Sequence, residues 1–122
     1  MFEVYVKTHF SAAHRLVNYP GNCARWHGHN WEVTLFIEAR ELNALGIALD
    51  FREIKKFLAD LLAELDHADL NAIPEFAALN PTSEVIARYL YRQAVARLTD
   101  ANLRVARVTV CETAGTGASY YE

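Results

Sequence analysis

The sequence predicts an α+β fold, in which an antiparallel four-stranded sheet carries two helices on one face. Two segments in the first third of the chain alternate apolar and polar residues, as half-buried strands do. Two apolar stripes at helical spacing follow, and two further strand-like segments close the chain. The predicted order is therefore strand, strand, helix, helix, strand, strand. Because strands and helices do not alternate, an antiparallel sheet with the helices gathered on one face is favoured.

The first predicted strand covers residues 2–13. Its even-numbered positions are mostly apolar, and His14 continues their parity. His9 has the opposite parity, so we expect its side chain to be exposed and to have no metal role.

The second predicted strand covers residues 31–39, with its odd-numbered positions apolar. His27 and His29 share the parity of these positions. A strand continued backwards would therefore place both imidazoles on the inward face, where they need partners, and a metal ion is one such partner.

Two helices and two more strands follow. Asp50 is the predicted N-cap of the first helix, which runs to about Leu65, and Thr82 caps the second, which runs to about Leu98. The inward residues of the second helix are expected to be Val85, Ile86, Tyr89, Leu90, Ala94, Val95 and Leu98. Residues 71–80 are predicted to form a loop, and residues 103–113 and 118–121 the last two strands.

Length and composition narrow the class of protein. A chain of 122 residues suits one domain spanning residues 1–122. The net charge is −3 and Lys and Arg form no run, which argues against nucleic acid or an anionic membrane as partner. No apolar segment is long enough to span a membrane and no secretory signal is recognisable, so we predict a cytoplasmic protein. Cys23 and Cys111 could form one bridge, but reduced thiols are expected in that compartment.

The segment Cys23-Ala24-Arg25-Trp26-His27-Gly28-His29 predicts a metal site. In an extended chain His27 and His29 point the same way, and His14 ends the earlier apolar run. Three neutral nitrogen ligands without a fourth protein ligand are typical of a catalytic zinc with an open position. A His-Gly-His segment by itself could equally be a polar turn before a strand. His14 and Cys23 together favour the metal site, although a structural zinc would follow if a cysteine were a fourth ligand.

Four residues besides the three histidines could carry chemistry. Cys23 lies close in sequence to the predicted cation, which would make its thiol easier to ionise. Asp66-His67 offers an acid/base imidazole beside a carboxylate, but the pair could also be ordinary decoration of a helix C-terminus. Glu112 shares the parity of inward positions in its strand. It could bind a guanidine-like edge of a substrate or simply face solvent at the strand end.

Five short motifs occur in the order seen in the 6-pyruvoyltetrahydropterin synthase family, which this sequence resembles over essentially its whole length. They are Phe10-Ser11-Ala12-Ala13-His14, Cys23-x3-His27-Gly28-His29, Leu65-Asp66-His67, Asn80-Pro81-Thr82-Ser83-Glu84 and Cys111-Glu112-Thr113. The spacing between Cys23 and His27 resembles the bacterial, 6-carboxytetrahydropterin-forming branch of queuosine biosynthesis. The pyruvoyl-forming enzymes of animals instead resemble Cys-x5-His-Gly-His.

The resemblance implies a tunnelling fold (T-fold) that assembles into barrel-like trimers and a homohexamer, with active sites between subunits. It implies that His14, His27 and His29 bind zinc. By the same resemblance Cys23 is the general base, and Asp66 and His67 complete a triad that relays a proton. The pterin-binding residues implied are Glu112, which anchors the amino-pyrimidine edge, and Thr82, Ser83 and Glu84 near the pocket.

The activity implied is zinc-dependent conversion of 7,8-dihydroneopterin triphosphate to 6-carboxy-5,6,7,8-tetrahydropterin, with release of acetaldehyde and triphosphate. Two alternatives remain at this point. One is formation of the 6-pyruvoyl product from the same substrate, and the other is a non-catalytic zinc- and pterin-binding protein.

Overall fold

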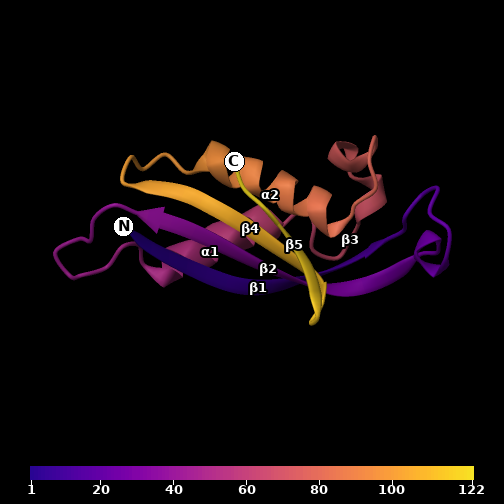
Figure 1. Cartoon of the computed structure of the whole chain (residues 1–122), viewed down its shortest axis with the longest axis horizontal. Coiled ribbons are helices and arrows are strands. Elements are labelled where there is room, and N and C mark those ends of the chain that lie inside the picture. The colour runs from indigo at the N-terminus through magenta and orange to yellow at the C-terminus, as the bar shows by residue number, and fades with distance from the viewer.

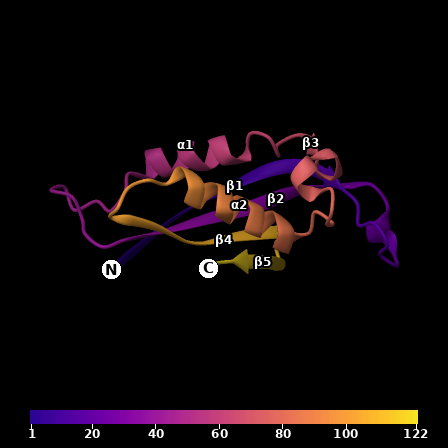
Figure 2. The same cartoon turned by 90° about the horizontal axis from the view of Figure 1, so that it is seen from above.

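The computed structural model describes all 122 residues, and its strands form one five-stranded sheet in the order β3-β1-β2-β4-β5 (Figure 1). The strands are β1 (Phe2–His14), β2 (His27–Ala39), β3 (Ala68–Asp69), β4 (Leu103–Thr113) and β5 (Thr116–Tyr120). The helices are α1 (Phe51–Leu62) and α2 (Ser83–Arg97). Both helices pack on the same face of the sheet (Figure 2), so the predicted α+β class is confirmed.

The prediction of four antiparallel strands was wrong at one edge of the sheet. Strand β3 pairs in parallel with β1, Ala68 opposite Ala12 and Asp69 opposite Ala13, and the other strand pairs are antiparallel. A strand of two residues is too short to show an alternation of apolar and polar positions. This strand exists only because the chain returns alongside β1, which no local pattern indicates.

The central pair of strands, β1 and β2, sets the register of the site. Phe10 pairs with Trp31, and their rings stack with centroids 5.9 Å apart. The same register continues to the strand end, where Ala12 lies opposite His29 and His14 opposite His27. Strand β2 begins at His27, four residues before the predicted start at Trp31, and its inward face runs without interruption from the core into the histidines.

Helix α1 begins where its cap predicted and ends earlier than expected. The Asp50 carboxylate accepts a hydrogen bond from the backbone N–H of Arg52. The helix ends at Leu62 rather than near Leu65, although Leu65 is fully buried. The apolar spacing continued past the end of the helix because the next turn also packs on the core, so periodicity alone overestimated its length.

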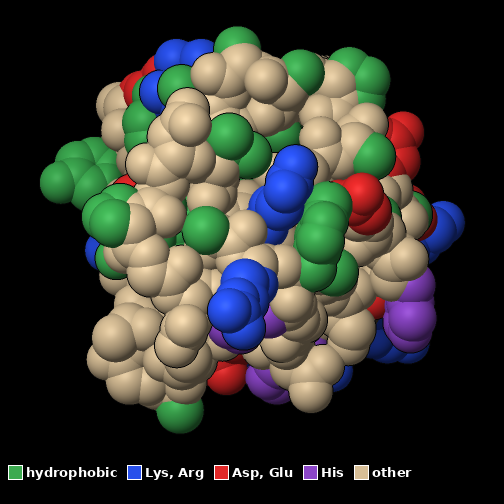
Figure 3. Space-filling view, turned by 90° about the vertical axis from the view of Figure 1, so that its right-hand side faces the viewer, with side chains coloured by type: hydrophobic (Ala, Val, Ile, Leu, Met, Phe, Trp, Pro, Cys, Tyr) green, Lys and Arg blue, Asp and Glu red, His purple; other side chains and the backbone are tan.

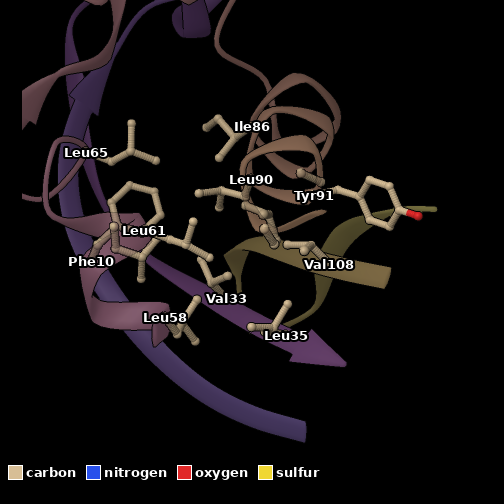
Figure 4. Close-up of a cluster of buried hydrophobic side chains, with 14 of the residues drawn as sticks. Phe10, Val33, Leu35, Leu58, Leu61, Leu65, Ile86, Leu90, Tyr91 and Val108 are labelled. Carbon is tan, nitrogen blue, oxygen red and sulfur yellow. The ribbon is translucent and has the colours of Figure 1, made fainter. Parts of the chain in front are cut away.

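Helix α2 is capped by the Thr82 hydroxyl, which accepts from the backbone N–H of Val85. Its buried side is rotated relative to the prediction. Val95 is 47% exposed, whereas Tyr91 is 5% exposed and packs edge-on against Tyr120 of β5. The helix lies over β4 and β5 at the sheet edge, so its buried stripe follows these strands (Figure 4).

The predicted loop 71–80 contains two short 3-10 turns, Leu70–Ala72 and Pro74–Phe76. Leu70 and Phe76 are buried and fasten this segment to the core. No helix of the chain has the length and apolar character needed to cross a membrane.

Candidate metal centre

Three imidazoles converge at the end of the β1–β2 pair. The ring centroids of His14, His27 and His29 lie 4.5 to 5.1 Å from one another. Together with a Glu112 oxygen, their ligand atoms all fall within 4.8 Å of one another. Ligand atoms this close together could hold a single ion after small side-chain adjustments, since zinc–nitrogen distances are about 2.0–2.1 Å.

The backbone pairing explains why these rings meet. Antiparallel partners and their diagonal neighbours on one face have side chains close enough to touch. His14 and His27 are direct partners, and His29 lies two residues further along the same face. The flanking Trp31 ring packs edge-on against both His14 and His29 and closes the inner side of the cluster.

Hydrogen bonds to backbone carbonyls fix the tautomers of two of these histidines. The Nδ1–H of His14 donates to the carbonyl of Pro81 at 2.9 Å, and that of His27 donates to the carbonyl of Arg25 at 2.7 Å. A carbonyl can only accept, so Nδ1 carries the proton in both rings. The Nε2 atoms are then left to face the centre of the cluster, which is the usual arrangement of metal-binding histidines.

Burial disfavours the charged form of two of the imidazoles. It lowers the pKa of His14, with the carbonyl of Pro81 and the Glu112 carboxylate acting in the opposite direction. Burial likewise lowers the pKa of His29, again opposed by Glu112. The Nε2 atoms of both rings are buried and accept no hydrogen bond.

The resulting arrangement fits a cation. A carboxylate oxygen of Glu112 lies 3.0 Å from Nε2 of His14 and 3.4 Å from Nε2 of His29. Lone pairs on neutral nitrogens that face a carboxylate repel it, and a metal ion between them would remove that repulsion. Three imidazole nitrogens, two of them on rings whose Nδ1 is bound to a backbone carbonyl, are a donor set suited to zinc.

Glu112 belongs both to the histidine cluster and to the lining of a neighbouring hollow. The hollow has a volume of about 320 Å³ and is lined by Leu16, Thr82, Ser83, Glu84, Glu112, Thr116, Gly117 and Ala118. The four residues expected to bind substrate therefore line one cavity. Sequence reasoning had placed Glu112 inward but not among the histidines, because parity in β4 does not say which residues of β1 and β2 it meets.

Cys23 lies outside the metal cluster. It is exposed, in the 3-10 turn Asn22–Ala24 of the segment between β1 and β2. Its carbonyl accepts a hydrogen bond from the N–H of Leu16 at 2.8 Å. No hydrogen bond or ion pair joins Cys23 to Asp66 or His67 within the chain, so the structure does not assemble that predicted triad in one subunit.

Asp66 and His67 do contact each other. Nδ1 of His67 lies 3.0 Å from Oδ1 of Asp66, and the same oxygen accepts the backbone N–H of Ser11. The hydrogen bond from Ser11 is the main cause that lowers the pKa of Asp66, with His67 contributing. Helix α1 ends at Leu62, and the backbone N–H of Asp66 donates to the Leu62 carbonyl, so the pair directly follows the helix C-terminus.

His67 is held in an unusual backbone conformation. Its φ of 58° lies in the left-handed region, which non-glycine residues rarely adopt. Its backbone N–H donates to the carbonyl of Ser11, which fixes this turn against the edge of β1. The exposed ring borders a second hollow that His29 also lines. On this end of the molecule, histidine side chains reach the surface beside Lys or Arg side chains (Figure 3).

His9 takes no part in the cluster. Its side chain is exposed and lies 3.4 Å from the Glu32 carboxylate on the face of the sheet opposite the helices. The parity argument that excluded it from the metal site agrees with this position.

An α+β subunit with a histidine cluster at the end of its central hairpin defines the class of this protein as a pterin-synthase-type T-fold. The chain belongs to the 6-pyruvoyl tetrahydropterin synthase family, whose sequence profile matches residues 3–122. The solved 6-pyruvoyl tetrahydropterin synthase of Caenorhabditis elegans superimposes with a TM-score of 0.88 at 24% identity. The superposition covers 99% of this chain and 95% of that structure.

Two relatives in sequence are named 6-carboxy-5,6,7,8-tetrahydropterin synthase. The protein of Synechocystis is 32% identical, over 99% of this chain and 94% of its own length. The protein of Bacillus subtilis is 33% identical, over 74% of this chain and 63% of its own length.

Replacement of a single cluster histidine tests the metal centre. We expect His14→Ala, His27→Ala and His29→Ala each to weaken Zn²⁺ binding by more than about 100-fold, because loss of an outer-shell partner alone typically costs roughly 10- to 100-fold. Competition with a chromophoric chelator measures the affinity. His9→Ala is the matched control and should bind Zn²⁺ as the unmodified protein does. Equal affinity in all four variants would contradict the assignment.

Proposed function

We propose that this protein converts 7,8-dihydroneopterin triphosphate to 6-carboxy-5,6,7,8-tetrahydropterin, with release of acetaldehyde and triphosphate, in queuosine biosynthesis. The observation that carries the proposal is the histidine cluster opening through Glu112 onto a hollow lined by polar residues of α2. The names of the sequence relatives support the same activity. One water is taken up for each substrate, which balances the atoms of the three products.

Zinc is the proposed cofactor, held by His14, His27 and His29. When bound, it supplies a Lewis acid that polarises a substrate oxygen and makes a neighbouring proton easier to remove. The carbonyls of Pro81 and Arg25 hold two of the rings so that their nitrogens face the ion. The chain supplies these ligands from two neighbouring strands, so the site exists before substrate binds.

Cys23 is the proposed general base. Its thiol stays outside the histidine cluster and is exposed, so it is free to take a proton from a side-chain carbon of the substrate. Cysteine suits this role because a nearby positive charge lowers the pKa of a thiol towards the operating pH.

Asp66 and His67 are the proposed acid pair. The Asp66 carboxylate holds Nδ1–H of His67, so that Nε2 of the ring is left to deliver or receive a proton. The Ser11 N–H fixes the carboxylate in turn. This order of contacts matches that of an oriented catalytic imidazole, with the ring itself exposed to the partner that it must reach.

Glu112, Thr82, Ser83 and Glu84 are proposed to bind the pterin. A carboxylate accepts two parallel hydrogen bonds from an amino-pyrimidine edge, which is a strong and directional contact. Glu112 lies between the hollow and the imidazoles, so a ring bound there would have its side chain next to the zinc.

A homohexamer of two trimers, with active sites between subunits, completes the proposal. Cys23 and His67 are both exposed and do not meet within one chain. The outer edge of β1 is paired only at Ala12 and Ala13, and β5 is also an edge strand. Unpaired strand edges favour pairing with other copies of the chain.

Product analysis tests the proposed activity. Incubation with 7,8-dihydroneopterin triphosphate should yield 6-carboxytetrahydropterin, acetaldehyde and triphosphate, identified by mass spectrometry and a coupled aldehyde assay. A chelator should abolish turnover and added Zn²⁺ should restore it. A 6-pyruvoyl product would instead assign the sister activity, and bound pterin without any release of triphosphate would show a non-catalytic binding protein.

Removal of the proposed base should separate metal binding from turnover. We expect Cys23→Ala to keep its zinc and to lose kcat by about 10²- to 10⁴-fold, the usual contribution of a positioned base. Cys111→Ala is the matched control, because Cys111 lies outside the metal cluster. Full activity in Cys23→Ala would remove the base assignment while leaving the zinc site intact.

Mixed oligomers test whether the site is shared between subunits. Cys23→Ala and His67→Ala are co-expressed, so that each oligomer mixes the two variants at random. About one quarter of the sites should then be active, because this fraction combines an intact cysteine of one subunit with an intact histidine of its neighbour. Light scattering should show the mass of six chains. If each subunit uses its own pair, the mixture will be as inactive as either variant.

A further inference from the structure

The segment that follows His14 is held in an extended form by two asparagine side chains. Oδ1 of Asn71 accepts the N–H of Arg15 at 2.9 Å, and Nδ2 of Asn71 donates to the carbonyl of Arg15 at 3.0 Å. Asn80 makes the same two bonds to Val17, at 2.8 and 3.0 Å. Each carboxamide therefore satisfies both backbone groups of one residue, as a neighbouring strand would.

These two contacts continue the pairing that β3 begins. Asp69 lies opposite Ala13 in parallel register, so Asn71 is the residue expected opposite Arg15. Its backbone has already turned into the 3-10 turn Leu70–Ala72 and cannot pair. The Asn71 side chain provides the donor and acceptor instead, and Asn80 repeats this two residues further along the clamped segment.

Leu16 lies between Arg15 and Val17, the two residues that the asparagines clamp, and it is hydrogen-bonded to Cys23. The N–H of Leu16 donates to the carbonyl of Cys23 at 2.8 Å, and Leu16 also lines the hollow that contains Glu112. The other hydrogen bonds of the turn around Cys23 are local, from Ala24 to Gly21 and from Arg25 to Asn22. The Leu16 bond is thus the one that relates the cysteine turn to the strand carrying His14.

We propose that Asn71 and Asn80 are positioning residues for the Cys23 thiol, an inference that rests on the proposed function. Their carboxamides fix residues 15–17, and the Leu16 N–H ties the turn that carries Cys23 to this fixed segment. The chain uses side chains for this purpose because Asn71 lies in a 3-10 turn and Asn80 lies between the turn Pro74–Phe76 and the cap of α2, so that no strand faces residues 15–17. A base must lie within about 3 Å of the proton it removes, so a loose turn lowers kcat.

The chain contains a matched control for this motif. Asn102 holds Glu41 in the same way, with Oδ1 accepting the Glu41 N–H at 3.0 Å and Nδ2 donating to the Glu41 carbonyl at 3.1 Å. Glu41 follows the far end of β2, a full strand length from His27. Loss of this clamp removes the same two hydrogen bonds without touching the proposed site.

The experiment compares Asn71→Ala, Asn80→Ala and Asn102→Ala, with Asn71→Asp and Asn80→Asp as milder variants that keep the acceptor and lose the donor. Hydrogen exchange of the Leu16 amide reports the clamp, and the rate of Cys23 alkylation by iodoacetamide as a function of pH reports the thiol. Zinc content, kcat and KM are measured on the same samples. The Asp variants keep the test decisive if an alanine variant fails to fold.

We expect the variants at 71 and 80 to exchange the Leu16 amide faster and to shift the pH profile of Cys23 alkylation. Their kcat should fall about tenfold or more, while zinc content is unchanged and KM changes less. Asn102→Ala should match the unmodified protein in all five measurements. Faster Leu16 exchange with unchanged kcat and alkylation would overturn the positioning role, and unchanged exchange would overturn the clamp itself. If the unmodified protein turns over no substrate, the proposed function fails, while exchange and alkylation still decide whether the asparagines place the thiol.

Discussion

The site depends on the antiparallel pairing of β1 with β2. This register sets His14 opposite His27 and brings His29 onto the same face. A slip of one residue would turn each imidazole of one strand away from the other strand's imidazoles, because successive side chains of a strand point to opposite faces. Further along the same face the stacked rings of Phe10 and Trp31 and the buried Val33 and Leu35 make such a slip costly. The hydrophobic core therefore also determines the geometry of the metal centre.

The buried histidine cluster lowers the stability of the folded chain. Burial disfavours the charged imidazoles and leaves two Nε2 atoms without hydrogen-bond partners. The carbonyls of Pro81 and Arg25 offset part of that cost and select the tautomer that leaves Nε2 free. A cation that binds this cluster in the native state alone would raise the stability of the folded chain. Metal binding and folding are thus expected to be coupled here.

The segments outside the sheet hold the remaining candidate groups by hydrogen bonds rather than by apolar burial. Ser11 binds Asp66 through its N–H and fixes the His67 turn through its carbonyl, and Asn71 and Asn80 hold the segment that leads towards Cys23. Both Cys23 and His67 remain exposed as a result.

The sequence by itself determined the fold class, the two capped helices, the long strands and the inward direction of His14, His27 and His29, because periodicity and capping are local properties of the chain. For Glu112 it left a substrate-binding role and a solvent-facing strand end as open alternatives, and it did not indicate that the carboxylate lies 3.0 Å from His14. Only the tertiary structure decided the parallel strand β3, the early end of α1, the rotation of the buried side of α2 and the clamps made by Asn71 and Asn80. Each of these arises where residues far apart in the chain meet, and the free energy of such contacts depends on distances in space that no local pattern contains.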